Sequence, residues 1–297
     1  MSHAELIVDA RNRVGESPVW HATEQALYWV DIPEKKLFRW SAATAQARSW
    51  AAPEMIGCIG IHSAGGWIAG MESGLFHLCV EGDALGAQHL AAAPHTASGM
   101  RFNDGRCDRQ GRFVAGTMLL NMDSGPGNSC VSSYENSSKL KLLVSGMVVP
   151  NGLAFSPDGR TMYLSDSHPS VQTVWAFDYD TRTGTPTNRR VFVDMKPLPG
   201  RPDGAAMDAD GCYWICGNDA GLVHRFTPQG VLDRSLVVPV KKPAMCAFGG
   251  RDLRTLFVTS IRPDGVDLSD QPLAGGVFAL RPGVQGLPEP VFGSPSP

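Results

Sequence analysis

Short, strand-like segments rich in aromatic and β-branched residues recur along this chain at a nearly constant interval. Each segment contains an aromatic residue, and successive aromatic residues lie 39, 46, 50, 50 and 44 positions apart. Such a period, with several strands in each unit, is typical of a β-propeller, in which one unit forms one blade. Six units fill the 297 residues. The six aromatic residues are Tyr28, Trp67, Phe113, Tyr163, Tyr213 and Phe257.

Dipeptides typical of tight turns lie just before the aromatic segments, at the same position of the repeat. Asp158-Gly159 and Asp210-Gly211 come just before their segments, and Gln110-Gly111 and Gly65-Gly66 hold matching places. Such dipeptides between alternating strands favour hairpin turns in which the glycine has a positive φ. No segment has the pattern of an amphipathic helix. The sequence therefore predicts an all-β, six-bladed β-propeller, with two β-sandwiches or an open solenoid as alternatives.

We expect a single β-propeller domain over residues 1–297. A propeller must close its ring, and a terminal strand that pairs into the last blade hides an exposed sheet edge. The strand-like run Glu5–Asp9 predicts that residues 1–12 close the last blade in this way. The ending Gly-Ser-Pro-Ser-Pro predicts that residues 290–297 form a frayed tail.

Composition excludes several classes of partner. The formal charge of −3 and the pI of about 6.2 argue against nucleic-acid binding, which needs a basic surface. No apolar run approaches the length of a membrane span or of a signal-peptide core. The seven cysteines have irregular spacing and no C-x-x-C pair, as expected for reduced thiols. We therefore expect a cytoplasmic protein that is a monomer or a weak homo-oligomer.

Polar residues recur at one position of the repeat. Asn103, Asn151 and Asp203 each lie eight residues before the turn glycine of their unit, and Glu16 lies in the same region of the first unit. Because the innermost strands of a propeller line its central channel, we expect these four side chains to meet at the channel mouth. Pro-Asn-Gly and Pro-Asp-Gly are also ordinary turn sequences. The constant eight-residue offset favours a site over a second turn, because each of these units already has its turn glycine further along the chain, at Gly111, Gly159 or Gly211.

This ring of oxygen atoms suits one divalent metal ion. Carboxylate and amide oxygens are typical ligands of Ca²⁺, Mg²⁺ or Mn²⁺, and Zn²⁺ or Fe²⁺ also accept them. Glu16 and Asp203 would balance the charge of the ion, whereas without it they would repel each other. Three or four protein ligands leave positions open for water or substrate, as in a catalytic metal site.

Several phrases of the sequence resemble the SMP-30/gluconolactonase/regucalcin family, from about residue 13 to about residue 285. That family has a six-bladed β-propeller fold and includes metal-dependent hydrolases of sugar lactones. The phrases are Gly15-Glu-Ser-Pro-Val-Trp20, Leu27-Tyr-Trp-Val-Asp31, Arg101-Phe-Asn-Asp-Gly105, Gly116-Thr-Met118, Pro150-Asn-Gly-Leu-Ala-Phe155, Arg201-Pro-Asp-Gly204 and Cys246-Ala-Phe-Gly-Gly250.

The resemblance implies a role for each matching residue. Glu16, Asn151 and Asp203 would hold the metal, and Asp203 would also act as the general base. Arg101 and Asn103 would contact the sugar hydroxyls. The expected activity is hydrolysis of an aldonolactone to the aldonic acid, which is a reaction at a carboxylic ester bond.

One segment departs from the family pattern. Residues 119–134 replace the usual polar lid, and Asn121 falls where the family often places a polar substrate contact. This departure leaves open which lactone is the substrate. An esterase or phosphotriesterase on the same scaffold and a non-enzymatic calcium-binding propeller are the alternative functions. A serine hydrolase is disfavoured because no G-x-S-x-G elbow is present.

Overall fold

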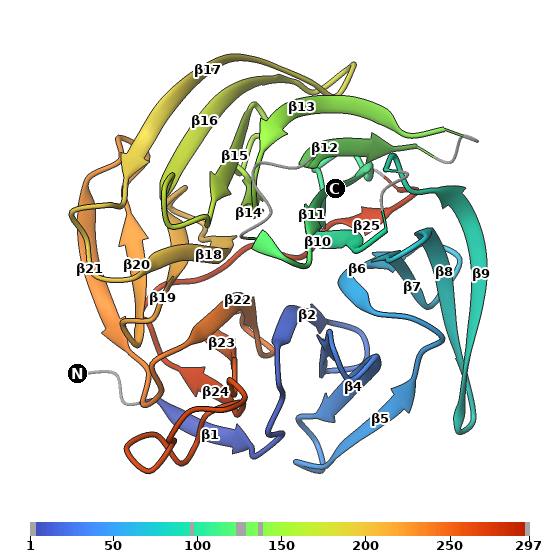
Figure 1. The fold of residues 1–297 in the computed structure, drawn as a ribbon, viewed down its shortest axis with the longest axis vertical. Helices are drawn as coiled ribbons and strands as arrows, with labels where there is room; N and C mark the ends of the chain where they lie inside the picture. Colours follow the sequence, from blue (N-terminus) through green and yellow to red (C-terminus); the bar gives the residue numbers. More distant parts are fainter. Residues whose placement is uncertain (1–3, 96–97, 123–128, 136–138, 295–297) are drawn as a thin grey trace.

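The computed structural model describes residues 4–95, 98–122, 129–135 and 139–294. Its strands form six sheets around a central axis, which confirms the predicted six-bladed β-propeller (Figure 1). All named elements in these ranges are β-strands. Within the described residues, no helix has both the length and the apolar character needed to cross a membrane.

Consecutive strands build each blade, and the first strand of each blade lies nearest the axis (Figure 1). Blade 1 consists of β2 (Gly15–His21), β3 (Ala26–Asp31), β4 (Lys36–Ser41) and β5 (Ala47–Ala51). Blade 2 consists of β6 (Ile56–His62), β7 (Trp67–Met71), β8 (Gly74–Glu81) and β9 (Ala84–Ala92). Blade 3 consists of β10 (Met100–Cys107), β11 (Phe113–Leu119), β12 (Ser129–Tyr134) and β13 (Lys141–Met147).

The remaining blades follow the same order. Blade 4 consists of β14 (Pro150–Phe155), β15 (Thr161–Asp166), β16 (Thr173–Asp180) and β17 (Thr185–Asp194). Blade 5 consists of β18 (Arg201–Met207), β19 (Tyr213–Asn218), β20 (Leu222–Phe226) and β21 (Leu232–Val237). Blade 6 consists of β22 (Pro243–Gly249), β23 (Thr255–Ser260), β24 (Val277–Leu280) and β1 (Glu5–Val8).

The turns between the first and second strands have the expected backbone. Gly111, Gly159 and Gly211 have φ values of 81°, 71° and 79°. In each turn the glycine N–H donates to the carbonyl three residues earlier, at 2.9–3.1 Å. A residue with a Cβ rarely adopts such a φ, so the in-phase glycines allow the chain to reverse tightly at the same place in three blades.

The core lies between the blades. Six clusters of buried apolar residues each join two neighbouring blades, and together they run around the ring. The predicted aromatic residues take part: the Tyr28 and Trp67 rings lie 4.4 Å apart, and those of Tyr163 and Tyr213 lie 5.1 Å apart. Because both faces of a blade pack on neighbours, the inner strands are buried along nearly their whole length rather than at alternate residues. This packing fixes the inner strands around the channel.

The N-terminal strand β1 pairs antiparallel with β24 in blade 6. Glu5 lies opposite Ala279 and Leu6 lies opposite Phe278. Blade 6 therefore combines strands from both ends of the chain, and this pairing covers the edge of β24.

The C-terminal segment, residues 281–294, crosses the ring instead of fraying. It runs from β24 in blade 6 to β25 (Val291–Phe292), which pairs in parallel with β6 in blade 2 (Figure 1). Phe292 is 1% exposed and stacks on Tyr134 at 5.7 Å. The expectation of a frayed tail over 290–297 is therefore wrong for these two residues, because they are packed in the core. Residues 295–297 lie outside the described residues.

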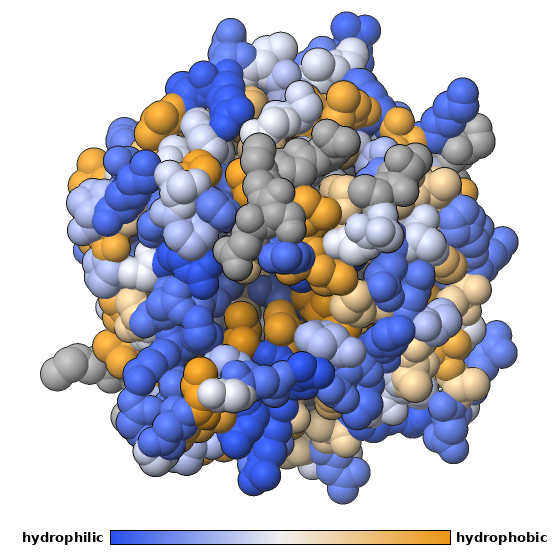
Figure 2. All heavy atoms as spheres, viewed as in Figure 1, coloured by the Kyte–Doolittle hydropathy of each residue, from blue (hydrophilic) through white to orange (hydrophobic). Residues whose placement is uncertain are grey.

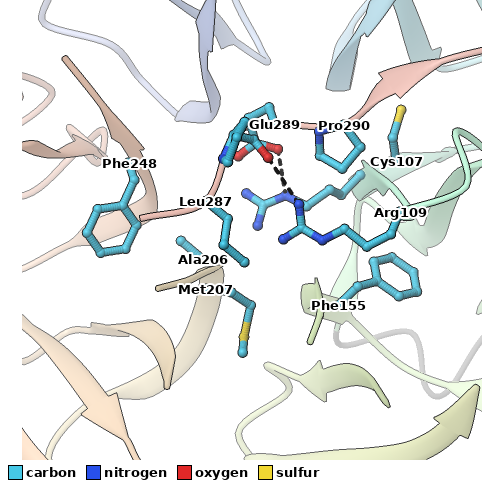
Figure 3. Close-up of a pocket in the computed structure, with 11 residues that line it drawn as sticks. Cys107, Arg109, Phe155, Ala206, Met207, Phe248, Leu287, Glu289 and Pro290 are labelled. Carbon is cyan, nitrogen blue, oxygen red and sulfur yellow. Dashed lines mark hydrogen bonds and ion pairs between the residues drawn. The ribbon is translucent and has the colours of Figure 1, made fainter. Parts of the chain in front are cut away.

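This segment closes the end of the channel at which the inner strands finish. Glu289 pairs with the Arg106 guanidinium at 3.6 Å, and both side chains are largely buried. Figure 3 shows Leu287, Glu289 and Pro290 between Phe248 on one side and Arg109 on the other. The remaining space measures only about 10 Å³. Access to the channel is therefore expected from the opposite end.

Candidate active site

A cavity of about 150 Å³ occupies the open mouth of the channel, where the inner strands begin. Figure 2 shows a hollow near the centre of this face, with hydrophilic residues gathered along one side of it and hydrophobic residues along the other. Polar side chains lining the cavity are Glu16, Arg101, Asn103, Asn151, Ser167, Arg201, Asp203 and Asn218. Apolar side chains lining it include Val14, Ile32, Met118, Met122, Val149 and Ile261.

The inner strands carry an irregularity that places these polar side chains. All six break their pairing register with the second strand of the blade. The breaks lie between Glu16 and Val19, Ile56 and Cys58, Phe102 and Gly105, Asn151 and Ala154, Pro202 and Ala205, and Pro243 and Cys246. A β-bulge bends a strand and redirects side chains. The four residues predicted from the repeat lie at or within these breaks, and all four line the cavity.

Asp203 lies among amide donors. Its Oδ1 accepts a hydrogen bond from Asn151 Nδ2 at 2.6 Å, and its Oδ2 accepts one from Asn218 Nδ2 at 2.6 Å. Asn151 Nδ2 also donates to Ser167 Oγ at 2.9 Å, and the Ser167 hydroxyl donates to the Pro202 carbonyl at 2.5 Å. These bonds hold the carboxylate of Asp203 in one orientation at the cavity wall.

Glu16 faces the same cavity with fewer partners. One of its oxygens accepts a hydrogen bond from the Ser17 N–H at 2.9 Å, and the side chain is nearly buried. Burial raises the pKa of Glu16 well above its ordinary range, and the nearby charges of Asp203 and Asp104 raise it further. Burial likewise raises the pKa of Asp203 to about 7, against the opposing effect of the Asn218 hydrogen bond. Two carboxylates thus share a poorly hydrated space, where a cation would stabilise both.

The residues present fit a divalent cation. Glu16 and Asp203 supply two carboxylates, and Asn151 Oδ1 accepts only one long hydrogen bond, 3.3 Å from the Gly152 N–H. Asn218 Oδ1 is buried without a hydrogen-bond partner. The described residues contain no group of three or more His, Cys, Asp or Glu side chains suited to a metal. The donor set here is instead two carboxylates with amide oxygens, which hard cations accept.

Arg101 and Asn103 form a linked polar pair on β10. Arg101 Nη1 donates to Asn103 Oδ1 at 2.7 Å and to the Phe102 carbonyl at 2.8 Å. Asn103 Nδ2 donates to the Pro150 carbonyl at 3.0 Å. Burial lowers the pKa of Arg101 to about 10, so the guanidinium remains charged at neutral pH. Arg101 Nε is buried and has no hydrogen-bond partner, so one donor of this side chain is unused.

The sequence-based set is incomplete. Ser167, Arg201 and Asn218 also line the cavity, and Asn218 contacts Asp203 directly. Asn218 ends β19, directly opposite Arg201 in the strand register, so only knowledge of that register could have identified it. Asn121 is exposed next to Met122, which lines the cavity, and its contact with substrate stays a prediction. In the departing segment 119–134, residues 123–128 lie outside the described residues, whereas Ser129–Tyr134 form the buried strand β12.

Known proteins share this architecture. A luciferin-regenerating enzyme superposes with a TM-score of 0.92 at 25% identity, covering 98% of this chain and 99% of the other. A calcium-binding protein, regucalcin, from Agrobacterium tumefaciens superposes with a TM-score of 0.91 at 27% identity, covering 98% and 97%. Both likenesses extend over the whole propeller.

Sequence comparison gives the same relatives. A 6-deoxy-6-sulfogluconolactonase from Pseudomonas putida is 41% identical over 290 residues, which cover 97% of this chain and 98% of that protein. Regucalcin from Danio rerio is 34% identical, with 96% of each chain covered. The family model described as SMP-30/Gluconolactonase/LRE-like region matches residues 14–262. The resemblance seen in the sequence phrases is thereby confirmed, and the chain belongs to the SMP-30/gluconolactonase/LRE-like family.

Proposed function

We propose that this protein hydrolyses a sugar lactone, an aldonolactone, to the aldonic acid with the help of one divalent metal ion. The observation that carries the proposal is the convergence of Glu16, Asn151 and Asp203 on one cavity beside the Arg101–Asn103 pair. The name of the sulfogluconolactonase relative supports a sugar lactone as the class of substrate. The polar pair favours a hydroxylated substrate over an apolar ester.

Glu16, Asn151 and Asp203 would hold the metal ion. When bound, the ion would supply positive charge that stabilises the negative charge developing on the carbonyl oxygen. The candidate ions are Ca²⁺, Zn²⁺, Mg²⁺, Mn²⁺ and Fe²⁺, all of which accept carboxylate oxygens.

The chain's own residues would perform the proton transfers. Asp203 would accept a proton from water as the water oxygen bonds to the carbonyl carbon, and the ring C–O bond would then break. Asp203 would return the proton to the departing ring oxygen, which yields the hydroxy acid. Its two amide hydrogen bonds orient the carboxylate for both steps.

Arg101 and Asn103 would orient the sugar. Arg101 lines the cavity and keeps its charge, and a charged donor makes stronger hydrogen bonds than a neutral one. Holding the lactone in one orientation lowers the entropic part of the barrier. The apolar side of the cavity would limit the water that competes for these donors.

A hydrolysis assay tests the proposal. A pH indicator would follow acid release from aldono-1,4- and 1,5-lactones, with an enzyme-free blank containing the same metal. We expect turnover above the blank by the unmodified protein and a loss of about 10²-fold in Glu16→Gln, because loss of a proposed metal ligand should cost at least as much as loss of a group that supports one. Glu5→Gln, on the exposed face of β1, is the matched control. No turnover of any lactone, or equal activity in both variants, would refute the proposal.

A further inference from the structure

Arg201 brings a second guanidinium to the cavity, from a different blade than Arg101. It is the first residue of β18, two residues before Asp203, so it lies roughly 7 Å nearer the open face along the strand. Arg101 and Arg201 come from β10 and β18, the inner strands on either side of β14. The two guanidinium groups therefore approach the cavity from two directions, and Arg201 stands at its rim.

A strained turn holds Arg201 in this place. Asp219 has a φ of 79°, a conformation that costs energy for a residue with a Cβ. Through this turn, two consecutive side chains point to β18. Asn218 donates to Asp203, and the Asp219 carboxylate accepts a hydrogen bond from Arg201 Nε at 2.6 Å. Backbone strain of this kind concentrates at functional sites.

The charges around the cavity do not suit a neutral ligand alone. Asp219 pairs with both Arg201 and Lys242, so these three side chains together carry one net positive charge. A divalent ion would cancel the charges of Glu16 and Asp203. The charge of Asp104, which acts on both Glu16 and Asp203, offsets that of one guanidinium. The Arg201 cluster at the rim keeps its net positive charge, so the part of a ligand that lies at the rim meets a cationic surface.

We propose that Arg201 selects lactones that carry a negatively charged substituent, a sulfonate, phosphate ester or carboxylate, on the part of the sugar remote from the lactone carbonyl. The inference rests on the proposed lactonase function and deepens it by naming the substrate class. The Arg201 guanidinium is held through Nε by Asp219 and through Nη1 by the Ser167 carbonyl at 3.4 Å, and its remaining Nη hydrogens can be donated to two oxygens of such an anion. Arg201 is thus assigned as a specificity-determining residue.

The test compares kcat/KM for 6-phosphoglucono-1,5-lactone, 6-deoxy-6-sulfoglucono-1,5-lactone and unsubstituted glucono-1,5-lactone. We expect the unmodified protein to favour the charged lactones. Arg201→Gln should lower the ratio of charged to neutral kcat/KM by about 10- to 100-fold, the range for loss of a charge-assisted hydrogen bond. Arg201→Lys should retain part of the ratio that Arg201→Gln loses, because lysine keeps the positive charge but lacks the planar guanidinium that can bind two oxygens at once. Arg190→Gln breaks an exposed Arg–Asp pair on β17 and serves as the matched control.

A binding measurement separates this inference from the proposed function. Calorimetry with 6-phosphogluconate and gluconate does not require turnover, and Arg201→Gln should weaken binding of the first much more than of the second. Equal losses for both ligands would overturn the inference, because Arg201 would then hold the product carboxylate or serve only the structure. An equal fall in kcat/KM for charged and neutral lactones would also overturn it. Failure of the unmodified protein to hydrolyse any lactone would overturn the proposed function, while the calorimetric comparison would still decide the role of Arg201.

Discussion

Replacing Asp203 by Asn should nearly abolish turnover and stabilise the metal-free protein. Burial raises the Asp203 pKa from about 3.9 in an unfolded chain to about 7. At about 1.4 kcal/mol per pKa unit, the ionised carboxylate costs the fold about 4 kcal/mol above pH 7. Asparagine at position 203 would have one acceptor oxygen instead of two, so its NH₂ group would face the NH₂ group of either Asn151 or Asn218, at a cost of about 1–3 kcal/mol. The variant should therefore gain about 1–3 kcal/mol of stability at pH 8.

The sign of the pH dependence provides the check. Because the folded carboxyl binds its proton more tightly than the unfolded one, metal-free stability falls as pH rises from about 4 to about 7. The variant lacks this contribution, so its advantage should shrink at pH 5. Urea unfolding with a chelator at pH 5 and pH 8 measures both quantities, and Asp178→Asn, an exposed carboxylate on β16, is the control. Turnover should fall by about 10²–10⁴-fold, the usual contribution of a general base. Near-normal turnover, or a variant less stable than the unmodified protein at pH 8, would refute the reasoning.

Three further predictions concern separate parts of the molecule. Arg101→Ala should lower kcat/KM for lactones by about 10- to 100-fold while calorimetric metal affinity survives, and loss of the metal would contradict its assignment to the substrate. Phe292→Ala should cost about 3–5 kcal/mol in urea unfolding, because the ring is buried against Tyr134, and a cost below about 1 kcal/mol would mean that β25 is not part of the core. Burial lowers the pKa of His224, so stability should decline as pH falls below about 6.5. His224→Gln should make the difference between the urea midpoints at pH 7.5 and pH 5.5 smaller. An unchanged difference would show that His224 is not the source of the decline.

The blade count and the centre of the site could be predicted because both depend on local, repeated signals. Aromatic residues at blade-length intervals mark the second strands, and turn glycines such as Gly159 require a positive φ that the printed sequence already suggests. Once each inner strand is located, symmetry alone brings Asn103, Asn151 and Asp203 to one axis. Neither step requires knowledge of side-chain packing.

Other features depend on contacts between distant parts of the chain. Phe292 pairs opposite His62, some 230 residues earlier, and its short apolar run next to Gly and Pro is typical of a tail. Asn218 reaches Asp203 only because of the register between β18 and β19. Arg201 stands at the cavity rim through a strained turn at Asp219, which no sequence pattern announces. The cytoplasmic location and the monomeric or weakly oligomeric state stay predictions.

The most direct test of metal-dependent lactone hydrolysis is a titration of metal-stripped protein with divalent cations in the lactone assay. Ca²⁺, Mg²⁺, Mn²⁺, Zn²⁺ and Fe²⁺ would each be added, with a metal-only blank and with parallel calorimetry. We expect at least one cation to restore turnover with saturation at one ion per chain, and Glu16→Gln to weaken its binding and the restored rate together. Full turnover in the stripped protein, or tight cation binding without hydrolysis of any lactone, would contradict the account.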